Sequence, residues 1–178
     1  ELTLLLNNGG VKAVGISGKD GGWLKATKKM HKDGDIGHVG DVAITDPTLI
    51  NLLISGGYIP VISPIGFDGA GNTFNLNADD VAAAVAAAVG AEKLVLMTDV
   101  NGIYRNYPDP SSFISKIDLT EAKALLNEVK GGMIPKLTCA ITAIESGVHT
   151  VHLLNGSTPH SLLIEVFSDS GIGTMIQK

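Results

Sequence analysis

The 178-residue chain has little cysteine, no long apolar run and no excess of basic residues, and each shortage excludes a class of protein. Its one cysteine, Cys139, cannot form an internal disulfide, which fits a reducing compartment such as the cytoplasm. No apolar run reaches the roughly 18 residues that a helix needs to cross a bilayer. The 13 Lys and Arg residues form no run and the net charge is −5, so we expect neither nucleic acid nor a membrane surface as a partner.

Common catalytic signatures are missing as well. The sequence has no Walker A motif, no Gly-x-Ser-x-Gly elbow and no pair of carboxylates typical of a glycosidase. We therefore expect no prosthetic group. The histidines show no metal-ligand spacing such as His-Glu-x-x-His, so the sequence predicts no metal ligands among His31, His38, His149, His152 and His160.

The hydrophobic pattern alternates between strands and helices along the chain, which predicts an α/β fold with a mainly parallel central sheet in a three-layer sandwich. The length suits one domain over residues 1–178. Residues 1–6 are typical of the end of a helix, with the glycines that follow as its stop. Strands are predicted at 11–17, 58–65, 94–100, 150–154 and 174–177, and residues 23–30 form either a strand or an extended arm. Helices are predicted at 46–55, 79–89, 118–129, 135–146 and 159–167.

Two of these elements carry specific expectations about burial. The near-continuous apolar run 58–65 predicts a strand buried on both faces of a parallel sheet. The helix that starts at Asp46-Pro47 is expected to bury one face, formed by Leu49, Ile50, Leu52 and Leu53.

Asn75, Asn77 and Asp79 stand two residues apart, directly before the alanine-rich helix. If the chain enters that helix in extended form, alternate side chains point the same way, so all three can face one pocket. Helix capping explains the same residues equally well, because Asn at the N-cap and Asp in the first turn stabilise a helix start. The pattern alone leaves both interpretations open.

Two later segments have the composition of a phosphate or nucleotide site. Residues 98–104 follow a buried strand, where Asp99 and the turn backbone can contact a nucleotide, although the Asn-Gly pair by itself predicts only a tight turn. In residues 131–136 a glycine turn brings Lys136 to a helix start. Helix-start N–H groups and a fixed cation suit phosphoryl transfer, whereas the plain alternative is a surface lysine.

A combination of five motifs, in this order, resembles the acetylglutamate kinases of the amino-acid kinase family. The similarity covers essentially the whole chain, and the combination is far more specific than any one motif. The motifs are Gly37-His-Val-Gly-Asp41, Gly57-Tyr-Ile-Pro-Val-Ile-Ser63, Asn75-Leu-Asn-Ala-Asp79, Gly90-Ala-Glu-Lys-Leu-Val-Leu-Met-Thr-Asp-Val-Asn-Gly102 and Gly131-Gly-Met-Ile-Pro-Lys136.

The resemblance implies phosphorylation of the γ-carboxylate of N-acetyl-L-glutamate by ATP with Mg²⁺, a step of arginine synthesis, in a homo-oligomer. By the same resemblance Asn75 and Asn77 bind the acetylglutamate, Asp79 organises the catalytic lysines, and Lys136 stabilises the transferring phosphoryl group. The nucleotide-binding residues that it implies are Asp99, Asn101, Gly102, Tyr104 and Lys130.

The tail resembles that of the arginine-inhibited members. Their effector site corresponds here to His152, Glu165, Gly171 and Gly173, which implies L-arginine as an inhibitor. Where those members read Asp-Gly-Arg after the strand, this chain reads Asn155-Gly-Ser157.

The family's upstream part, with its first lysine, its His-Gly-Gly-Gly loop and the arginine that grips the substrate, has no counterpart here. We therefore expect the chain to be the nucleotide-binding half, without the substrate-lid half. Two alternatives remain open: a fragment that only binds ATP or arginine, and a related kinase with another acceptor.

Overall fold

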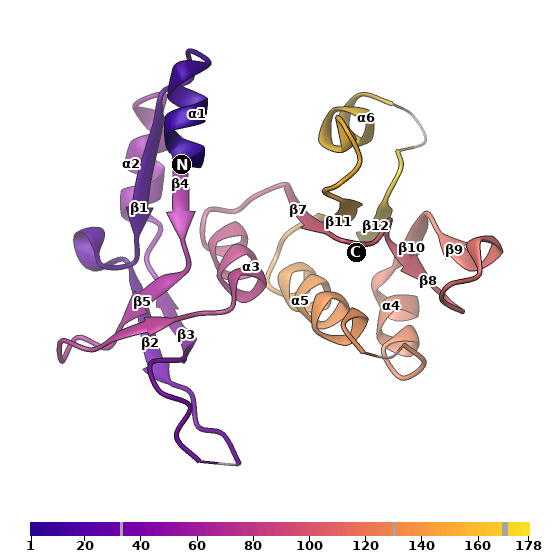
Figure 1. Ribbon diagram of the computed structural model, residues 1–178, viewed down its shortest axis with the longest axis horizontal. Helices are drawn as coiled ribbons and strands as arrows, with labels where there is room; N and C mark the ends of the chain where they lie inside the picture. The colour runs from indigo at the N-terminus through magenta and orange to yellow at the C-terminus, as the bar shows by residue number, and fades with distance from the viewer. Residues whose placement is uncertain (33, 130, 169–170) are drawn as a thin grey trace. The chain divides into compact units, whose positions relative to one another are not determined.

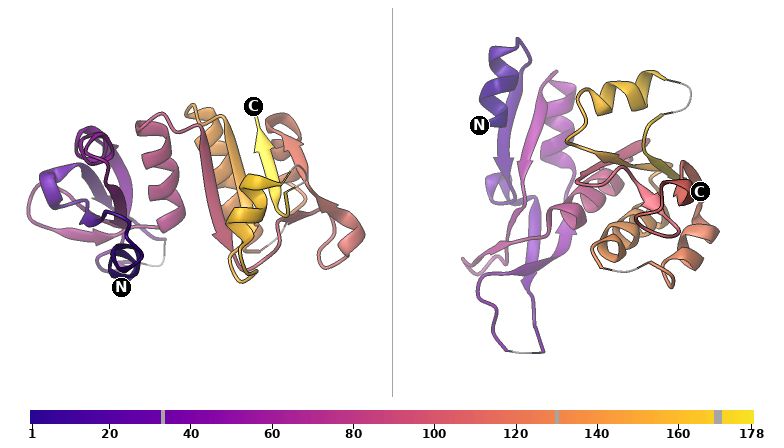
Figure 2. Two further views of the ribbon diagram at one scale, coloured as in Figure 1. Left: turned by 90° about the horizontal axis from the view of Figure 1, so that it is seen from above. Right: turned by 45° about the vertical axis from the view of Figure 1, so that its right-hand side comes forward.

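The computed structural model describes residues 1–32, 34–129, 131–168 and 171–178. They form two compact units, Glu1–Val89 and Gly90–Lys178, each with helices and strands of its own (Figures 1 and 2). That the whole chain acts as one domain stays a prediction. None of the described helices combines the length and the apolar character that crossing a bilayer requires.

The first unit alternates short helices and strands. In chain order its elements are α1 (Leu2–Asn8), β1 (Ala13–Ser17), the 3₁₀ turn η1 (Asp20–Gly22), β2 (Leu24–Lys28), β3 (Gly40–Thr45), α2 (Thr48–Ser55), β4 (Ile59–Ser63), β5 (Ile65–Phe67), β6 (Thr73–Asn75) and α3 (Ala78–Ala88).

Two small sheets hold the first unit together. Strands β1 and β4 pair in parallel, and a second sheet has the order β3-β2-β5-β6. One apolar cluster joins both sheets to α2 and α3, because it includes Ile16 of β1, Leu24 of β2, Ile50 of α2, Phe74 of β6 and Val81 of α3. The helices predicted at 1–6 and 79–89 are confirmed, with Gly9 following α1 and Gly90 following α3 at a φ of 64°.

The apolar run 58–65 is two strands instead of one. It divides at Pro64, whose ring leaves no N–H for a sheet ladder and whose carbonyl accepts from Leu76 N at 2.9 Å. Strand β4 pairs with β1, whereas β5 pairs with β2 and β6 in the other sheet. The prediction that this run is buried on both faces is wrong, since Ile59 is 51% exposed.

Two further expectations differ from the structure. Leu52 of α2 is 68% exposed, so the predicted apolar face is wrong at that position, while Ile50 is buried and Leu49 and Leu53 pack on the cluster. Strand β3 was not indicated by the sequence. Only Val42 of this strand packs against the apolar cluster, so its apolar alternation is too weak to predict a strand.

The second unit is a sheet with three helices packed on or beside it. In chain order its elements are β7 (Lys93–Thr98), β8 (Ile103–Tyr104), the 3₁₀ turn η2 (Pro110–Ser112), β9 (Phe113–Ile114), β10 (Lys116–Asp118), α4 (Leu119–Leu125), α5 (Met133–Glu145), β11 (Thr150–Asn155), α6 (Ser161–Phe167) and β12 (Thr174–Gln177).

The main sheet of the second unit has the order β10-β12-β11-β7, and β8 pairs separately with β9. Within the main sheet, β11 runs parallel to β7 and antiparallel to β12, which is parallel to β10. Four consecutive residues of β11 are buried, as expected of a strand covered on both faces. Helix α5 buries the predicted face, formed by Leu137, Ala140, Ile141 and Ile144. The predicted α/β class with parallel-rich sheets is confirmed.

Helix α4 begins where the sequence predicts, because the Asp118 side chain accepts from Glu121 N at 2.8 Å and caps it. It ends at Leu125 instead of near Val129. Residues 126–129 turn away from the helix, which places Glu128 and Val129 beside a pocket.

Candidate functional site

A pocket of about 610 Å³ lies in the second unit at the carboxyl end of β7. This volume is in the range of small-molecule sites. In sheets with parallel strands, ligands bind at this end of the strands, where loops lead into helices. The pocket brings together candidate residues from two segments far apart in the chain: Asp99 and Tyr104 from one, and Lys136 from the other.

The lining combines charge with aromatic surface. Arg105 and Lys136 supply two cations, and Asp99 and Glu128 supply two carboxylates. Tyr104 and Tyr107 pack edge to face with ring centroids 5.6 Å apart. Cations suit phosphate oxygens, and aromatic rings next to apolar side chains suit a planar base. Three further residues line the same pocket beyond the segments that the sequence indicated: Arg105, Asn106 and Tyr107.

Asp99 is positioned by the turn that follows β7. The buried Thr98 hydroxyl accepts from Val100 N at 2.9 Å and lies 3.0 Å from Val100 O, which closes the turn around Asp99. Asn101 points elsewhere. Its Oδ1 accepts from Asn155 Nδ2 at 2.8 Å, and both residues line a separate cavity of about 390 Å³. Nucleotide contacts by Asn101 stay a prediction.

Packing and backbone conformation together require glycine at position 102. Its φ is 148°, and a Cβ at this position would lie 2.5 Å from Thr174 Oγ1. The Thr174 hydroxyl accepts from Ile103 N at 2.8 Å and donates to Ile114 O, which fixes the start of β8 beside Tyr104. Lys130, the remaining predicted nucleotide residue, lies outside the described residues.

Lys136 stands in the first turn of α5 and is half buried. Gly131 has a φ of 61°, which turns the chain into the helix, and no side chain of the described residues caps the helix start at Gly132. An uncapped helix start presents backbone N–H groups that can donate hydrogen bonds to an anion. Asp79 belongs to the first unit and Lys136 to the second, and the predicted pairing of the two stays a prediction.

In the first unit the segment around Asn75 has the extended form that the sequence suggested. Phe74 and Leu76 are buried, whereas Asn75 and Asn77 are exposed, so the two amides share one face. Asn77 also caps α3, because its Oδ1 accepts from Asp79 N at 2.9 Å and from Asp80 N at 3.1 Å. The capping interpretation is therefore confirmed for Asn77, and its substrate role stays a prediction.

Replacing Asn77 with Ala should destabilise the first unit by about 1 kcal/mol, because the cap of α3 is lost. Trp23 is the single tryptophan and shares an apolar cluster with Val81 of α3, so its fluorescence during urea unfolding reports the change. Asn77→Ser is the matched control, since a hydroxyl retains the cap. Equal stability of the Ala and Ser variants would contradict the capping role.

Carboxylates crowd the start of α3. Partial burial raises the pKa of Asp80; Lys29 opposes this shift, while Asp79 and Asp41 add to it. Lys29 Nζ lies 2.7 Å from Asp41 Oδ1, and this contact raises the pKa of Lys29. The start of α3 therefore holds several negative charges near one lysine, a suitable place to orient a cation.

The motif Gly37–Asp41 pairs through its backbone with Asn75, the last residue of β6. His38 O accepts from Asn75 N at 2.8 Å, and Val39 forms a bridge with the same residue. Gly40 leaves no room for a side chain, because a Cβ would lie 2.8 Å from Phe74 Cβ. These contacts fix the position of the Asn75 backbone and so of the side-chain amide that it carries.

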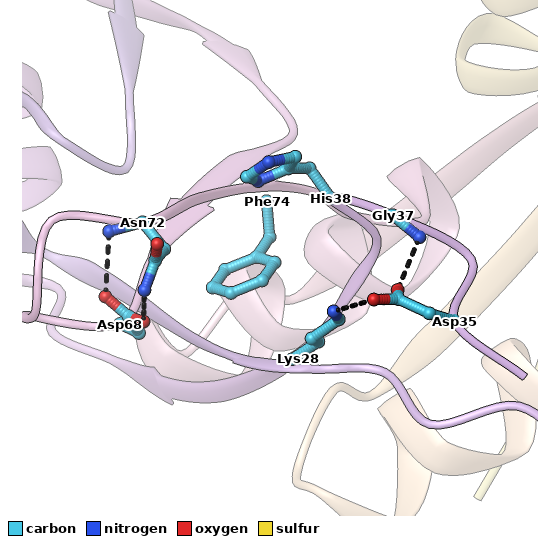
Figure 3. A pocket seen from close by; sticks show the side chains of 7 residues that line it. All are labelled: Lys28, Asp35, Gly37, His38, Asp68, Asn72 and Phe74. Atoms are coloured by element: carbon cyan, nitrogen blue, oxygen red, sulfur yellow. Dashed lines mark hydrogen bonds and ion pairs between the residues drawn. The ribbon is translucent and has the colours of Figure 1, made fainter.

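A pocket of about 380 Å³ lies beside this motif, and Figure 3 shows the side chains that line it. Its polar groups are paired with one another. Lys28 Nζ lies 2.6 Å from Asp35 Oδ2, and Asp68 accepts from Asn72 Nδ2 at 2.6 Å, on either side of Phe74. None of the predicted substrate residues lines it. Among the described residues, no group of three or more His, Cys, Asp or Glu could hold a metal ion.

The four predicted effector residues come together in the second unit. His152 Nδ1 lies 2.7 Å from Glu165 Oε1, and both side chains are buried. Because an ionised carboxylate only accepts, the proton of this hydrogen bond is on His152 Nδ1. Glu165 Oε2 accepts from Ile172 N at 2.7 Å and from Gly173 N at 3.1 Å. Gly171 lies against the same carboxylate, with space for no side chain.

Burial alone would raise the pKa of Glu165, but the hydrogen bond with His152 and the two backbone N–H donors outweigh it and lower this pKa. A lowered folded-state pKa stabilises the fold above the ordinary value of 4.5, and the gain is lost as the pH falls through the folded pKa. We expect the protection of the Ile172 and Gly173 amides, measured by hydrogen exchange relative to their intrinsic exchange rates, to fall as the pH drops below about 4.5. Glu165→Gln should abolish this pH dependence, and an unchanged pH profile in that variant would contradict the assignment.

The model of the amino acid kinase family matches residues 1–155. The chain belongs to this family. The match includes the segment around Asn75 and every residue that lines the pocket around Lys136, whereas Glu165, Gly171 and Gly173 lie beyond it.

Individual relatives confirm the resemblance to acetylglutamate kinases. The acetylglutamate kinase of Symbiobacterium thermophilum is 49% identical over 177 residues, which cover 95% of this chain and 60% of that protein. A structure of N-acetylglutamate synthase from Neisseria gonorrhoeae, complexed with coenzyme A and N-acetyl-glutamate, aligns with a TM-score of 0.88 at 32% identity, over 98% of this chain and 40% of its own. The same synthase complexed with coenzyme A and L-arginine aligns at 0.80, also at 32% identity, over 94% and 38%. The chain spans about 60% of the length of the curated relatives.

Proposed function

We propose that this chain supplies the nucleotide-binding part of a kinase that transfers a phosphoryl group from ATP to the γ-carboxylate of N-acetyl-L-glutamate, in arginine biosynthesis in the cytoplasm. The observation that carries the proposal is the pocket at the end of β7, in which two cations, two carboxylates and two tyrosines meet. The names of the relatives support the choice of acceptor.

Each group in the pocket has a task in this proposal. Tyr104 and Tyr107 hold the adenine, since rings of the lining face the pocket next to Val129 and Met133. Lys136 meets the negative charge that develops on the transferring phosphoryl group. Mg²⁺ arrives with ATP as part of the substrate. Asp99 and Glu128 offer the carboxylate oxygens that this hard cation prefers.

In this proposal the first unit contributes the residues that bind the phosphoryl acceptor, N-acetyl-L-glutamate. Asn75 and Asn77 project their amides from one exposed face, and amides suit the carboxylates and the acetyl carbonyl of N-acetyl-L-glutamate. Asp79 orients Lys136 in this proposal. The family's homo-oligomeric assembly is proposed as well.

Calorimetry of the 178-residue chain with a non-hydrolysable ATP analogue tests the nucleotide site. Tyr107 is 72% exposed, so Tyr107→Ala should leave the fold intact and weaken binding by about tenfold, or 1.4 kcal/mol. Tyr58→Ala is the matched control, because Tyr58 is an exposed tyrosine of the other unit. An equal effect of both substitutions, or no binding by the unchanged chain, would reject the site. Binding without any turnover by the chain alone would favour a binding module.

We also propose L-arginine as an effector at the cluster of His152 and Glu165. A guanidinium pairs well with a carboxylate, and the three donors that Glu165 accepts from leave one of its about four lone-pair positions for a further N–H. The synthase relative was solved with L-arginine, which supports this choice of ligand. Titration of the chain and of Glu165→Gln with L-arginine, with L-lysine as the control ligand, tests it; equal heats for both chains would reject it.

A further inference from the structure

The sheet β3-β2-β5-β6 buries one of its faces and exposes the other. Ala26 of β2, Gly40 of β3 and Phe74 of β6 are buried, and a Cβ on Gly40 would lie 2.8 Å from Phe74 Cβ. Because side chains alternate along a strand, the residues next to these three point to the opposite face. Asn75, which follows Phe74, is exposed on that face. The amide to which we assign acceptor binding therefore projects from the exposed face of the sheet.

Lys29 lies on the same face as Asn75. Its backbone N donates to Val39 O at 2.9 Å, and Val39 in turn forms a parallel bridge with Asn75. Residues that pair across neighbouring strands point to one face, so the side chains of Lys29 and Asn75 share it. Their backbones are two strand spacings apart, or about 10 Å. A cation therefore stands close to the amide of Asn75.

Three carboxylates surround this lysine. Lys29 Nζ lies 2.7 Å from Asp41 Oδ1, and Asp80 in the first turn of α3 interacts electrostatically with both residues. Asp79 adds a third negative charge at the same helix start. N-acetyl-L-glutamate is itself a dianion at neutral pH, because both of its carboxyl groups are ionised. An acceptor that binds at Asn75 therefore meets three negative charges and one positive charge.

We propose that the charge of Lys29 sets the affinity for the acceptor, because it offsets the repulsion that the three carboxylates exert on a dianion bound at Asn75. The inference rests on the proposed function, which names N-acetyl-L-glutamate as that acceptor. Lys29 acts here through its electrostatic field and takes no part in phosphoryl transfer. Its loss should therefore raise KM for the acceptor and leave kcat nearly unchanged.

Lys28 provides a matched control. Its side chain lies beside Phe74 on the other face of the sheet, as Figure 3 shows, and its Nζ lies 2.6 Å from Asp35 Oδ2. The side chains of Lys28 and Lys29 are 44% and 43% exposed. The two lysines thus agree in charge, exposure and type of partner, and differ in the face of the sheet that they occupy.

The test is steady-state phosphorylation of N-acetyl-L-glutamate by a chimera, in which residues 1–178 replace the matched part of the Symbiobacterium thermophilum acetylglutamate kinase. At an ionic strength of about 0.01 M, we expect Lys29→Met to raise KM for the acceptor about two- to fourfold, the attraction between a unit charge and a dianion about 10 Å apart in water. At about 1 M salt the increase should shrink to less than about 1.5-fold, because the Debye length is then only about 3 Å. Lys28→Met should leave KM unchanged at both ionic strengths.

Asp41→Asn separates the electrostatic role from a structural one. This substitution removes a negative charge together with the ion pair, so the proposal predicts a lower KM for the acceptor at low salt, opposite in sign to the effect of Lys29→Met. A salt bridge that only fastens β2 to β3 predicts changes in the same direction for both variants, at low and at high salt. Lys29→Arg keeps the charge and should stay within about twofold of the unaltered chimera.

Three results would overturn the proposal. They are equal KM changes in Lys29→Met and Lys28→Met, an effect of Lys29→Met that persists at about 1 M salt, and an effect of Asp41→Asn with the same sign as that of Lys29→Met. A different result bears on the proposed function. If the unaltered chimera binds a non-hydrolysable ATP analogue but does not phosphorylate N-acetyl-L-glutamate, the choice of acceptor is wrong, and the inference about Lys29 is wrong with it.

Discussion

Lys136→Ala is expected to lower kcat by about 30- to 1,000-fold, which corresponds to about 2–4 kcal/mol in the barrier. The lysine is half buried in the first turn of α5, in a pocket that also holds Arg105. Phosphoryl transfer spreads negative charge over oxygens that a fixed cation stabilises more in the transition state than in the ground state. The effect should therefore fall mainly on kcat, with a smaller change in KM for ATP.

The substitution is best measured in the chimera with the Symbiobacterium thermophilum enzyme, by steady-state phosphorylation of N-acetyl-L-glutamate. Lys93→Ala is the control, because Lys93 is an exposed lysine of the same unit that lies 3.5 Å from Glu92, outside the pocket. Lys136→Arg keeps the charge but changes its geometry, and we expect it to recover only part of the loss. An unchanged kcat in Lys136→Ala would remove this residue from the transition state.

Gly102→Ala should cost about 3 kcal/mol of stability in the second unit, from steric overlap and backbone strain together. At a φ of 148° the new Cβ would lie 2.5 Å from Thr174 Oγ1 and 3.0 Å from Phe113 Cε2. Thr174 is fully buried and its hydroxyl holds Ile103 N, so it cannot move away without breaking that bond. The loss should appear as a lower urea midpoint in far-ultraviolet circular dichroism.

Gly156→Ala is the matched control for this prediction. A Cβ there would meet Met97 Cβ at 3.5 Å, an ordinary contact, and should change the stability by less than about 1 kcal/mol. If Gly102→Ala were as stable as Gly156→Ala, the packing account of Gly102 would be wrong.

The local patterns of the sequence predicted what depends on neighbours along the chain. The start of α3 at Asn77 and that of α4 at Asp118 followed from capping chemistry, which acts over two or three residues. The strand at 174–177 and the buried face of α5 followed from hydrophobic periodicity. The motifs were also enough to indicate the amino acid kinase family, because several of them occur in the right order.

Other features depended on residues that are distant in the sequence. Pro64 divides an apolar run that is continuous in the sequence. The strand before it, β4, and the strand after it, β5, belong to two different sheets. The sequence could not indicate that Arg105 and Tyr107 share a pocket with Lys136, since the fold brings β8, the end of α4 and the start of α5 to one strand end. Nor could it separate Asn101, which bonds Asn155, from Asp99, two residues away on the pocket side.

By itself the sequence determined the α/β class, the family and the residue types of the candidate site, because local propensity and the order of motifs depend on the chain alone. Only the tertiary structure decided which of those residues meet, that Gly102 is fixed by Thr174, and that Lys29 shares a face of its sheet with Asn75. These features are contacts between distant segments. They are stabilised by close packing and by backbone hydrogen bonds, neither of which can be predicted from residues that are neighbours in the sequence.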